Sequence, residues 1–200
     1  IFEEYFNASD WSAASVDGVA VPENMPAGWS VFDATGNNFL WRWSTEGPRG
    51  PYTSDPWNVP NNNIKIKSTS DNTLGGEQGF IMFELDFYYS CIPGEWDEVL
   101  MDSYIQFPVI DATENSAVNV YFEQYHRFCC TSYSAEAGPK LYISNDSVNW
   151  TRYDVHQASI NSTPTTNPSV FEVTISNIVA NQSTVYIRLQ IKGESHYYWM

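Results

Sequence analysis

The 200-residue sequence is poor in basic residues, with nine Lys and Arg against 24 Asp and Glu, and its formal net charge is −15. A chain without a cluster of Lys and Arg cannot neutralise a phosphate backbone, so the composition excludes nucleic acid as a partner. The same charge disfavours an anionic membrane surface. It permits cation binding, above all of Ca²⁺, which takes oxygen ligands. Solubility by self-repulsion is the alternative explanation of the charge.

Long apolar runs are missing too. No run of 18 apolar residues exists, so we expect no membrane insertion. The sequence starts at Ile1 without a signal peptide, which indicates a processed start. It stops inside the apolar run Tyr197-Tyr198-Trp199-Met200, so we expect a domain that is truncated within its last strand.

Cysteine is scarce, with Cys91, Cys129 and Cys130 only. An odd number allows at most one internal disulfide, which we predict between Cys91 and one of the vicinal pair. Closing that loop contributes about 4 kcal/mol in the chain-entropy model. Three reduced, buried thiols are the alternative. No Cys-x-x-Cys with a partner pair is present, so a zinc site is not expected.

Signatures of catalysis are absent as well: no nucleophile elbow, zinc-protease helix, phosphate loop or dinucleotide fingerprint occurs. His126 with Cys129 or Cys130 could form a nucleophile pair, but vicinal cysteines beside aromatic residues are more often structural. Among 24 acidic residues some carboxylate pair always exists, and nothing marks one out for glycoside cleavage. We therefore expect no enzymatic activity.

Helical periodicity is also lacking, and alternation with period two takes its place. In 184–192, Val185, Ile187, Leu189 and Ile191 share one face. Segments 80–89, 117–126 and 170–176 alternate in the same way, and in the first of them Glu84 and Asp86 are predicted on the solvent side. Such alternation is typical of half-buried strands.

The remaining segments complete an all-β pattern. Strands 139–144 and 148–154 flank the turn residues Asn145-Asp146-Ser147, which predicts a hairpin. Short strands are expected at 1–6, 29–33, 39–43 and 63–67, joined by long loops. The sequence thus predicts an antiparallel β-sandwich of jelly-roll type, folded as a single domain over residues 1–200.

Aromatic residues are abundant, at 16% of the chain. Trp11, Tyr52, Trp57 and Trp96 lie in Gly/Pro-rich or acidic segments outside the alternating strands. Exposed rings stack on sugars or fill partner pockets, so we predict these four as ligand-binding residues. Coverage of the ends of the sandwich is the alternative role.

Several motifs follow one another in a characteristic order. The chain opens with Phe2-Glu3-Glu4-Tyr5-Phe6, and then come Pro26-Ala27-Gly28-Trp29 and Asp33 before Asn37-Asn38-Phe39-Leu40-Trp41. The hairpin Ser144-Asn145-Asp146-Ser147-Val148-Asn149-Trp150 and the end Trp199-Met200 complete the order. This set resembles the cleaved-adhesin, or MAM-like, jelly-roll modules of secreted surface proteins in Bacteroidetes-type bacteria. Segment 44–78 and the region Cys129–Gly138 match no part of that pattern.

The resemblance implies a non-catalytic module, secreted or on the bacterial cell surface, that mediates adhesion or assembly and holds structural calcium. Its partners would be a glycan, a surface protein or other chains of a surface assembly. A carbohydrate-binding accessory module of a larger secreted hydrolase is the alternative. The family pattern also places Trp29, Trp41, Trp43 and Trp150 in the core.

Calcium ligands are predicted from two sources. Asp33, Asn37 and Asn38 cluster side-chain oxygens on one loop, and Glu136 precedes the hairpin. The resemblance adds Glu4, facing acidic residues of the last strand. Ordinary turn or surface roles are the alternative for all five. The resemblance further implies O-glycosylation at Ser147, within Asp146-Ser147-Val148 on the hairpin tip.

Overall fold

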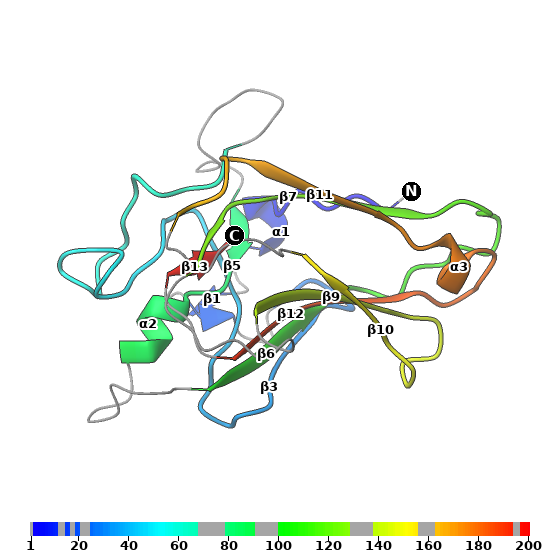
Figure 1. The fold of residues 1–200 in the computed structure, drawn as a ribbon, viewed down its shortest axis with the longest axis horizontal. Coiled ribbons are helices and arrows are strands. Elements are labelled where there is room, and N and C mark those ends of the chain that lie inside the picture. Colours follow the sequence, from blue (N-terminus) through cyan, green and yellow to red (C-terminus); the bar gives the residue numbers. More distant parts are fainter. Residues whose placement is uncertain are drawn as a thin grey trace.

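The computed structural model of the chain describes residues 2–11, 15–16, 19–20, 25–67, 79–90, 100–128, 138–155, 163–193 and 197–200. A five-stranded antiparallel sheet forms one layer of the fold (Figure 1). Its strands, in spatial order, are β10 (Thr151–Asp154), β9 (Gly138–Ser144), β12 (Tyr186–Gly193), β6 (Met101–Gln106) and β3 (Ser30–Asp33).

Short strand pairs join into a second antiparallel layer, which contains β7 and β11 in Figure 1. β11 (Ser169–Thr174) pairs with β7 (Asn119–Gln124), which continues through one residue into β8 (His126–Arg127). β13 (Tyr198–Trp199) pairs with β8 and, through Trp199, with Phe83. Phe83 extends β5 (Phe80–Met82), which pairs with β4 (Arg42–Ser44). The order is therefore β11, β7–β8, β13, β5, β4.

The connections between these strands define the sandwich. The chain changes layer between β3 and β4, β5 and β6, β6 and β7, β8 and β9, β10 and β11, β11 and β12, and β12 and β13. Frequent crossing between two antiparallel layers is typical of jelly rolls. The fold is thus the all-β, antiparallel sandwich of jelly-roll type that the sequence predicts.

Helices are few and short in the described segments. They are α1 (Ala8–Trp11), α2 (Leu85–Ser90) and α3 (Ser176–Val179), and a small hairpin joins β1 (Ser15–Val16) to β2 (Val19–Ala20). None of the helices in this part of the chain is long and apolar enough to cross a membrane.

The main core lies between the two layers. Alternation places one row of apolar side chains from each strand inside, because successive residues of a strand point to opposite faces. The inward residues are Leu141 and Ile143 from β9, Ile187, Leu189 and Ile191 from β12, Ile105 from β6, and Val120, Phe122, Phe171 and Val173 from the opposite layer. A second cluster of Phe80, Met82, Tyr198 and Met200 is covered by Ile64 and Ile66. β5 is therefore buried on both faces.

Most strand predictions are confirmed. Segments 117–126, 170–176 and 184–192 correspond, to within two residues at each end, to β7–β8, β11 and β12, and the hairpin forms with Lys140 opposite Asp154. The segments 29–33 and 39–43 correspond to β3 and, shifted by a few residues, to β4. The predicted strands at 1–6 and 63–67 are wrong, because residues 2–7 are irregular and only a single bridge residue closes the second segment.

The strand predicted over 80–89 is correct only as far as Phe83, because α2 begins at Leu85. Glu84 and Asp86 were predicted on the solvent side, and this is wrong, since both are buried. Arginine side chains and loop backbone groups compensate their charge. Trp29, Trp41 and Trp43 lie in the core as predicted.

Candidate functional site

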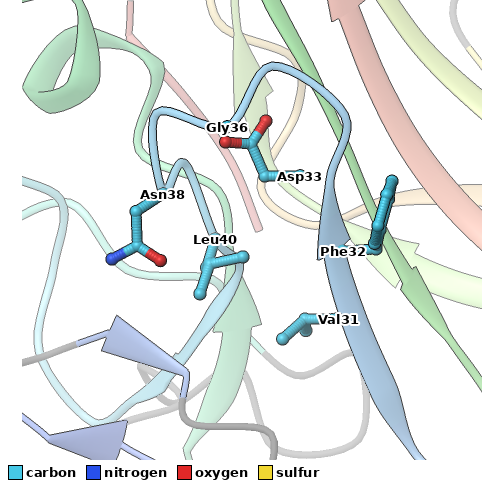
Figure 2. Close-up of a pocket in the computed structure, with 6 residues that line it drawn as sticks. All are labelled: Val31, Phe32, Asp33, Gly36, Asn38 and Leu40. Atoms are coloured by element: carbon cyan, nitrogen blue, oxygen red, sulfur yellow. The ribbon is translucent and has the colours of Figure 1, made fainter.

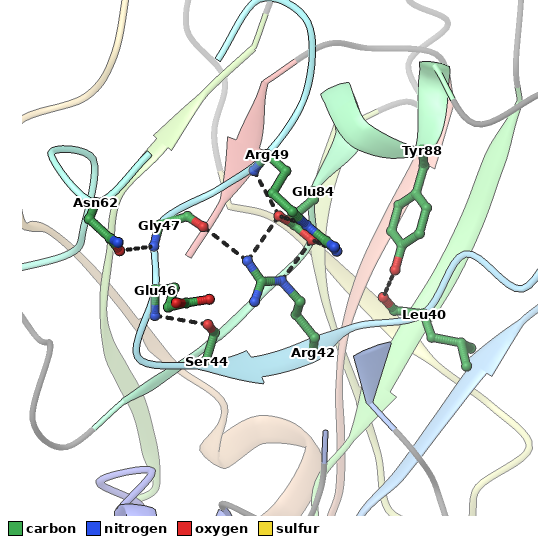
Figure 3. A network of polar contacts seen from close by, with 9 residues as sticks. All are labelled: Leu40, Arg42, Ser44, Glu46, Gly47, Arg49, Asn62, Glu84 and Tyr88. Carbon is green, nitrogen blue, oxygen red and sulfur yellow. Dashed lines mark hydrogen bonds and ion pairs between the residues drawn. The ribbon is translucent and has the colours of Figure 1, made fainter. Parts of the chain in front are cut away.

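A buried carboxylate, Glu84, lies at the end of β5 and binds two arginines, Arg42 and Arg49, that are distant in the sequence (Figure 3). Arg42 donates to it from Nε at 2.7 Å and from a terminal nitrogen at 2.9 Å. Arg49 donates from its side chain at 2.8 Å and from its backbone N–H at 2.8 Å. Arg42 also donates to the Gly47 carbonyl at 3.0 Å. Charge-assisted bonds of this kind are the strong ones, so Glu84 fixes the chain from Arg42 to Arg49.

A second buried carboxylate, Asp86, fixes the segment that follows. Its Oδ2 accepts hydrogen bonds from the Tyr52 backbone N–H at 2.7 Å and the Thr53 hydroxyl at 2.8 Å. Gly50 lies so close that a Cβ there would come within 2.5 Å of Asp86, and its φ of +131° also favours glycine. The Gly50 N–H donates to the Trp57 carbonyl at 2.8 Å, which closes the turn.

These anchors hold a long loop, residues 47–67, which we call the aromatic loop. Tyr52 is 61% exposed, Trp57 45% and Val59 47%, although Glu84 and Asp86 bind the backbone of the same loop on its buried side. The Trp57 ring lies 5.8 Å from the ring of Phe87, and the Arg49 guanidinium covers Phe87 at 3.8 Å. The arrangement is a fixed surface with two exposed rings, which suits binding, because a preformed surface loses little entropy when a ligand docks.

The other predicted ligand-binding residues are placed differently. Trp11 is only 1% exposed, so its prediction as a ligand-binding residue is wrong. Its ring packs against Trp29 at 4.9 Å and Phe6 at 5.3 Å, and its Nε1 donates to Glu4 at 3.2 Å. Trp96 lies outside the described residues. Tyr52 and Trp57 are therefore the two predicted residues that the structure exposes on one loop.

The predicted calcium ligand Asp33 serves its own loop. Its carboxylate accepts hydrogen bonds from the Thr35 N–H at 3.0 Å, the Thr35 hydroxyl at 2.7 Å and the Phe39 N–H at 3.0 Å. Asp33 and Asn38 line a shallow hollow of about 270 Å³ between β3 and the following loop (Figure 2). Asn37 is exposed beside it.

Glu4 is also occupied by protein donors, because its Oε1 accepts from the Phe6 N–H at 2.7 Å as well as from Trp11. The described segments contain no group of three or more His, Cys, Asp or Glu side chains placed to hold a metal ion. Glu136 lies outside these segments, and so do Cys91, Cys129 and Cys130. Structural calcium and the disulfide stay predictions.

The predicted glycosylation residue, Ser147, lies on the exposed tip of the β9–β10 hairpin. Asp146 organises this tip by accepting bonds from the Asn149 N–H at 2.7 Å and the Val148 N–H at 2.8 Å. The bonds from Asn149, backbone first and then side chain, hold the pKa of Asp146 far below its usual value. Ser147 has a φ of 61°. Its modification stays a prediction, which the intact mass of the protein purified from its source would test.

Sequence reasoning missed the outward position of Trp150. The family pattern placed this residue in the core, which is wrong, since its ring is partly exposed on the outer face of the five-stranded sheet. There it lies 3.8 Å from the Arg188 guanidinium, and its Nε1 donates to the Ser147 carbonyl at 3.1 Å. The aromatic–arginine contact offsets the lack of apolar burial.

No protein-family model and no curated protein sequence matches the chain. Among solved structures, the chain is similar to the K1 cleaved adhesin domain of Lys-gingipain from Porphyromonas gingivalis W83. The TM-score is 0.40 and the sequence identity 15%, over 88% of this chain and 86% of that chain. The fold class stated above rests on the strand pairing and not on this likeness.

Proposed function

We propose that this chain is a non-catalytic, adhesin-type binding module of a secreted or bacterial cell-surface protein, and that the aromatic loop is its contact surface. One observation carries the proposal: Tyr52 and Trp57 stay exposed on a loop that the buried carboxylates Glu84 and Asp86 fix from below. Exposed aromatic side chains provide most of the contact energy in many binding sites.

The partner in this proposal is a glycan or a surface protein, which includes other chains of a surface assembly. Rings of Tyr and Trp serve both, because they combine a large apolar face with a polar group that can hydrogen-bond. A carbohydrate-binding accessory module of a larger secreted hydrolase is the second candidate, and the same two exposed rings favour it.

A glycan array probed with the chain and three variants tests the proposal. Trp57→Ala and Tyr52→Ala remove the exposed rings, and Tyr121→Ala removes a ring that is 56% exposed on β7, in the opposite layer. Selective sugar binding that is lost in the first two variants and kept in the third supports the carbohydrate-binding candidate. Absence of sugar binding, with attachment to a cell surface that depends on Trp57, supports protein adhesion. Binding of an uncharged glycan that all three variants retain would contradict the proposed surface.

Structural calcium belongs to the same proposal and is supported by the excess of 24 acidic over nine basic residues. A ligand that binds the native state alone raises the unfolding temperature. Calorimetric unfolding in calcium is therefore expected to occur several degrees higher than in chelator, since saturation of one site at a hundredfold excess over Kd contributes about 2.7 kcal/mol. Identical unfolding temperatures in calcium, magnesium and chelator would remove calcium from the proposal.

A further inference from the structure

The outer face of the five-stranded sheet carries a group of aromatic residues around one arginine. Strand register places Arg188 of β12 opposite Gln106 of β6 and Tyr142 of β9, and it places Phe32 of β3 opposite Tyr104 of β6. These positions alternate with the inward core residues, so their side chains point away from the core. We name this group the arginine face; it consists of Phe32, Tyr104, Gln106, Trp150, Tyr186 and Arg188.

Arg188 is held between two rings at the centre of the arginine face. Its guanidinium carbon lies 3.8 Å from the centre of the Trp150 ring and 4.3 Å from that of Tyr104. Its Nε donates to Gln106 Oε1 at 2.7 Å, which fixes the in-plane orientation of the group. An arginine stacked in this way presents its remaining N–H donors along its edge.

Arg188 has no carboxylate partner among the described residues. Arg42 and Arg49 pair with Glu84, Lys140 and Arg152 with Asp154, and Lys192 with Asp102. In a chain with 24 acidic and nine basic residues, a partly buried arginine without a counter-charge is unexpected. Burial also lowers the pKa of Arg188 from its usual value, because desolvation disfavours the charged form. An anion from outside the chain would supply the missing charge.

The charge of the described strand residues on this side of the sheet also favours an anion. Four of the nine basic residues, Lys140, Arg152, Arg188 and Lys192, project from the described strands on this side, and the two acidic residues among the same positions are Asp102 and Asp154. These positions therefore carry 4 − 2 = +2 in a chain of net charge −15. An anionic ligand is therefore attracted to this face and repelled by most of the remaining surface.

The surroundings of Arg188 indicate the class of anion. Phe32, 50% exposed, lies 5.3 Å from Tyr104, and Tyr186 lies 6.4 Å from Trp150. Rings on both sides of an arginine suit a sugar that stacks on a ring while its carboxylate accepts from the guanidinium. A peptide strand would need unpaired backbone, and β9, β12 and β6 are inner strands, bonded on both sides.

We propose that the arginine face is a second binding site, which recognises uronate residues of an acidic polysaccharide through Arg188. The ligand carboxylate pairs with the open edge of the Arg188 guanidinium, and a neighbouring sugar ring stacks on Phe32 or Tyr186. This site is separate from the aromatic loop, and the proposal does not depend on the function proposed for that loop.

Calorimetric titration of the full chain with oligogalacturonate tests the site without any mutation. The expected result is binding that weakens as salt rises from about 50 to about 500 mM, because screening reduces an ion pair. The fully methyl-esterified oligosaccharide has the same sugar rings without the charge, and we expect it to bind at least about tenfold more weakly. Equal affinity for the two forms, or no binding of oligogalacturonate, overturns the proposal.

Two arginine variants locate the site. Arg188→Gln is expected to weaken oligogalacturonate binding by about tenfold or more, and Arg188→Lys, which keeps the charge without the planar fork, by less. Arg127→Gln is the matched control, since Arg127 also stacks on a tyrosine, Tyr197, at 3.8 Å and belongs to the other layer. An equal loss in Arg127→Gln overturns the assignment to Arg188. Polyglutamate that binds as tightly as oligogalacturonate, and equally through Arg188, overturns the choice of a glycan.

Discussion

Glu84→Gln is expected to destabilise the protein by about 3–5 kcal/mol, the largest effect that a single polar substitution should have here. The side chains of Arg42 and Arg49 are 3% and 13% exposed, and Glu84 is their shared carboxylate partner in the described residues. A neutral amide of the same shape removes the negative charge that the buried Arg42 and the partly buried Arg49 share. Urea unfolding followed by tryptophan fluorescence measures the change in the free energy of unfolding.

The matched control is Glu172→Gln, because Glu172 is an exposed glutamate on β11. Surface substitutions of this kind change stability by about 0.5 kcal/mol or less. Hydrogen exchange in Glu84→Gln is also expected to be faster for the Gly50 and Thr53 amides, because the aromatic loop loses an anchor. A loss of stability below about 1 kcal/mol would show that the buried ion cluster is not what holds this loop.

Trp199→Ala is expected to cost about 3–5 kcal/mol, as large-to-small substitutions in a core do. Trp199 is 1% exposed in β13, where its backbone bonds to Phe83 and its ring lies 5.1 Å from Trp41. Its indole Nε1 donates to Gln124 Oε1 at 2.9 Å, so the substitution also leaves the buried amide of Gln124 without this donor. Thermal and urea unfolding measure the loss.

Trp57→Ala provides the comparison for Trp199→Ala, because it is the same chemical change at a position that is 45% exposed. We expect it to cost less than about 1.5 kcal/mol, since close to half of the residue's surface stays in contact with water in the folded protein. Similar losses in the two variants would contradict the position of Trp199 at the centre of the second layer.

The fold was predictable from the sequence because one face of most strands is buried and the other is exposed. In β12 the inward Ile187, Leu189 and Ile191 alternate with outward polar residues, and a shift by one residue would expose the whole apolar row. The hairpin was predictable for a similar reason, since the turn chemistry at Asn145 and Asp146 fixes where the two strands separate.

Glu84 and Asp86 show where period-two reasoning fails. The prediction used Ile81 and Phe83 as the buried face and assigned the acids to solvent. Phe80 and Met82 share the parity of the two acids, so an apolar residue at every position from 80 to 83 already indicated burial on both faces. The compensating arginines lie 35 and 42 residues away, and no local pattern relates them to Glu84.

Tryptophan positions could be predicted only in part. Trp41 and Trp43 flank or form β4 and are buried, as expected, whereas Trp11 is buried and Trp150 is partly exposed, against expectation. The composition of the sequence around a tryptophan indicates whether it lies in a loop. The burial of its ring depends on which distant ring or cation packs against that ring. For Trp11 this is Trp29, and for Trp150 it is Arg188.

The aromatic loop is the contact surface that we propose for this binding module. The most direct test of this surface uses the glycan or surface protein that the array and attachment experiments identify. That ligand is titrated against wild-type chain, Trp57→Ala and Tyr121→Ala. Trp57→Ala is expected to raise Kd by about tenfold or more, which corresponds to about 1.4 kcal/mol, whereas Tyr121→Ala is expected to leave Kd unchanged. The same Kd for all three proteins would contradict a contact surface on the aromatic loop.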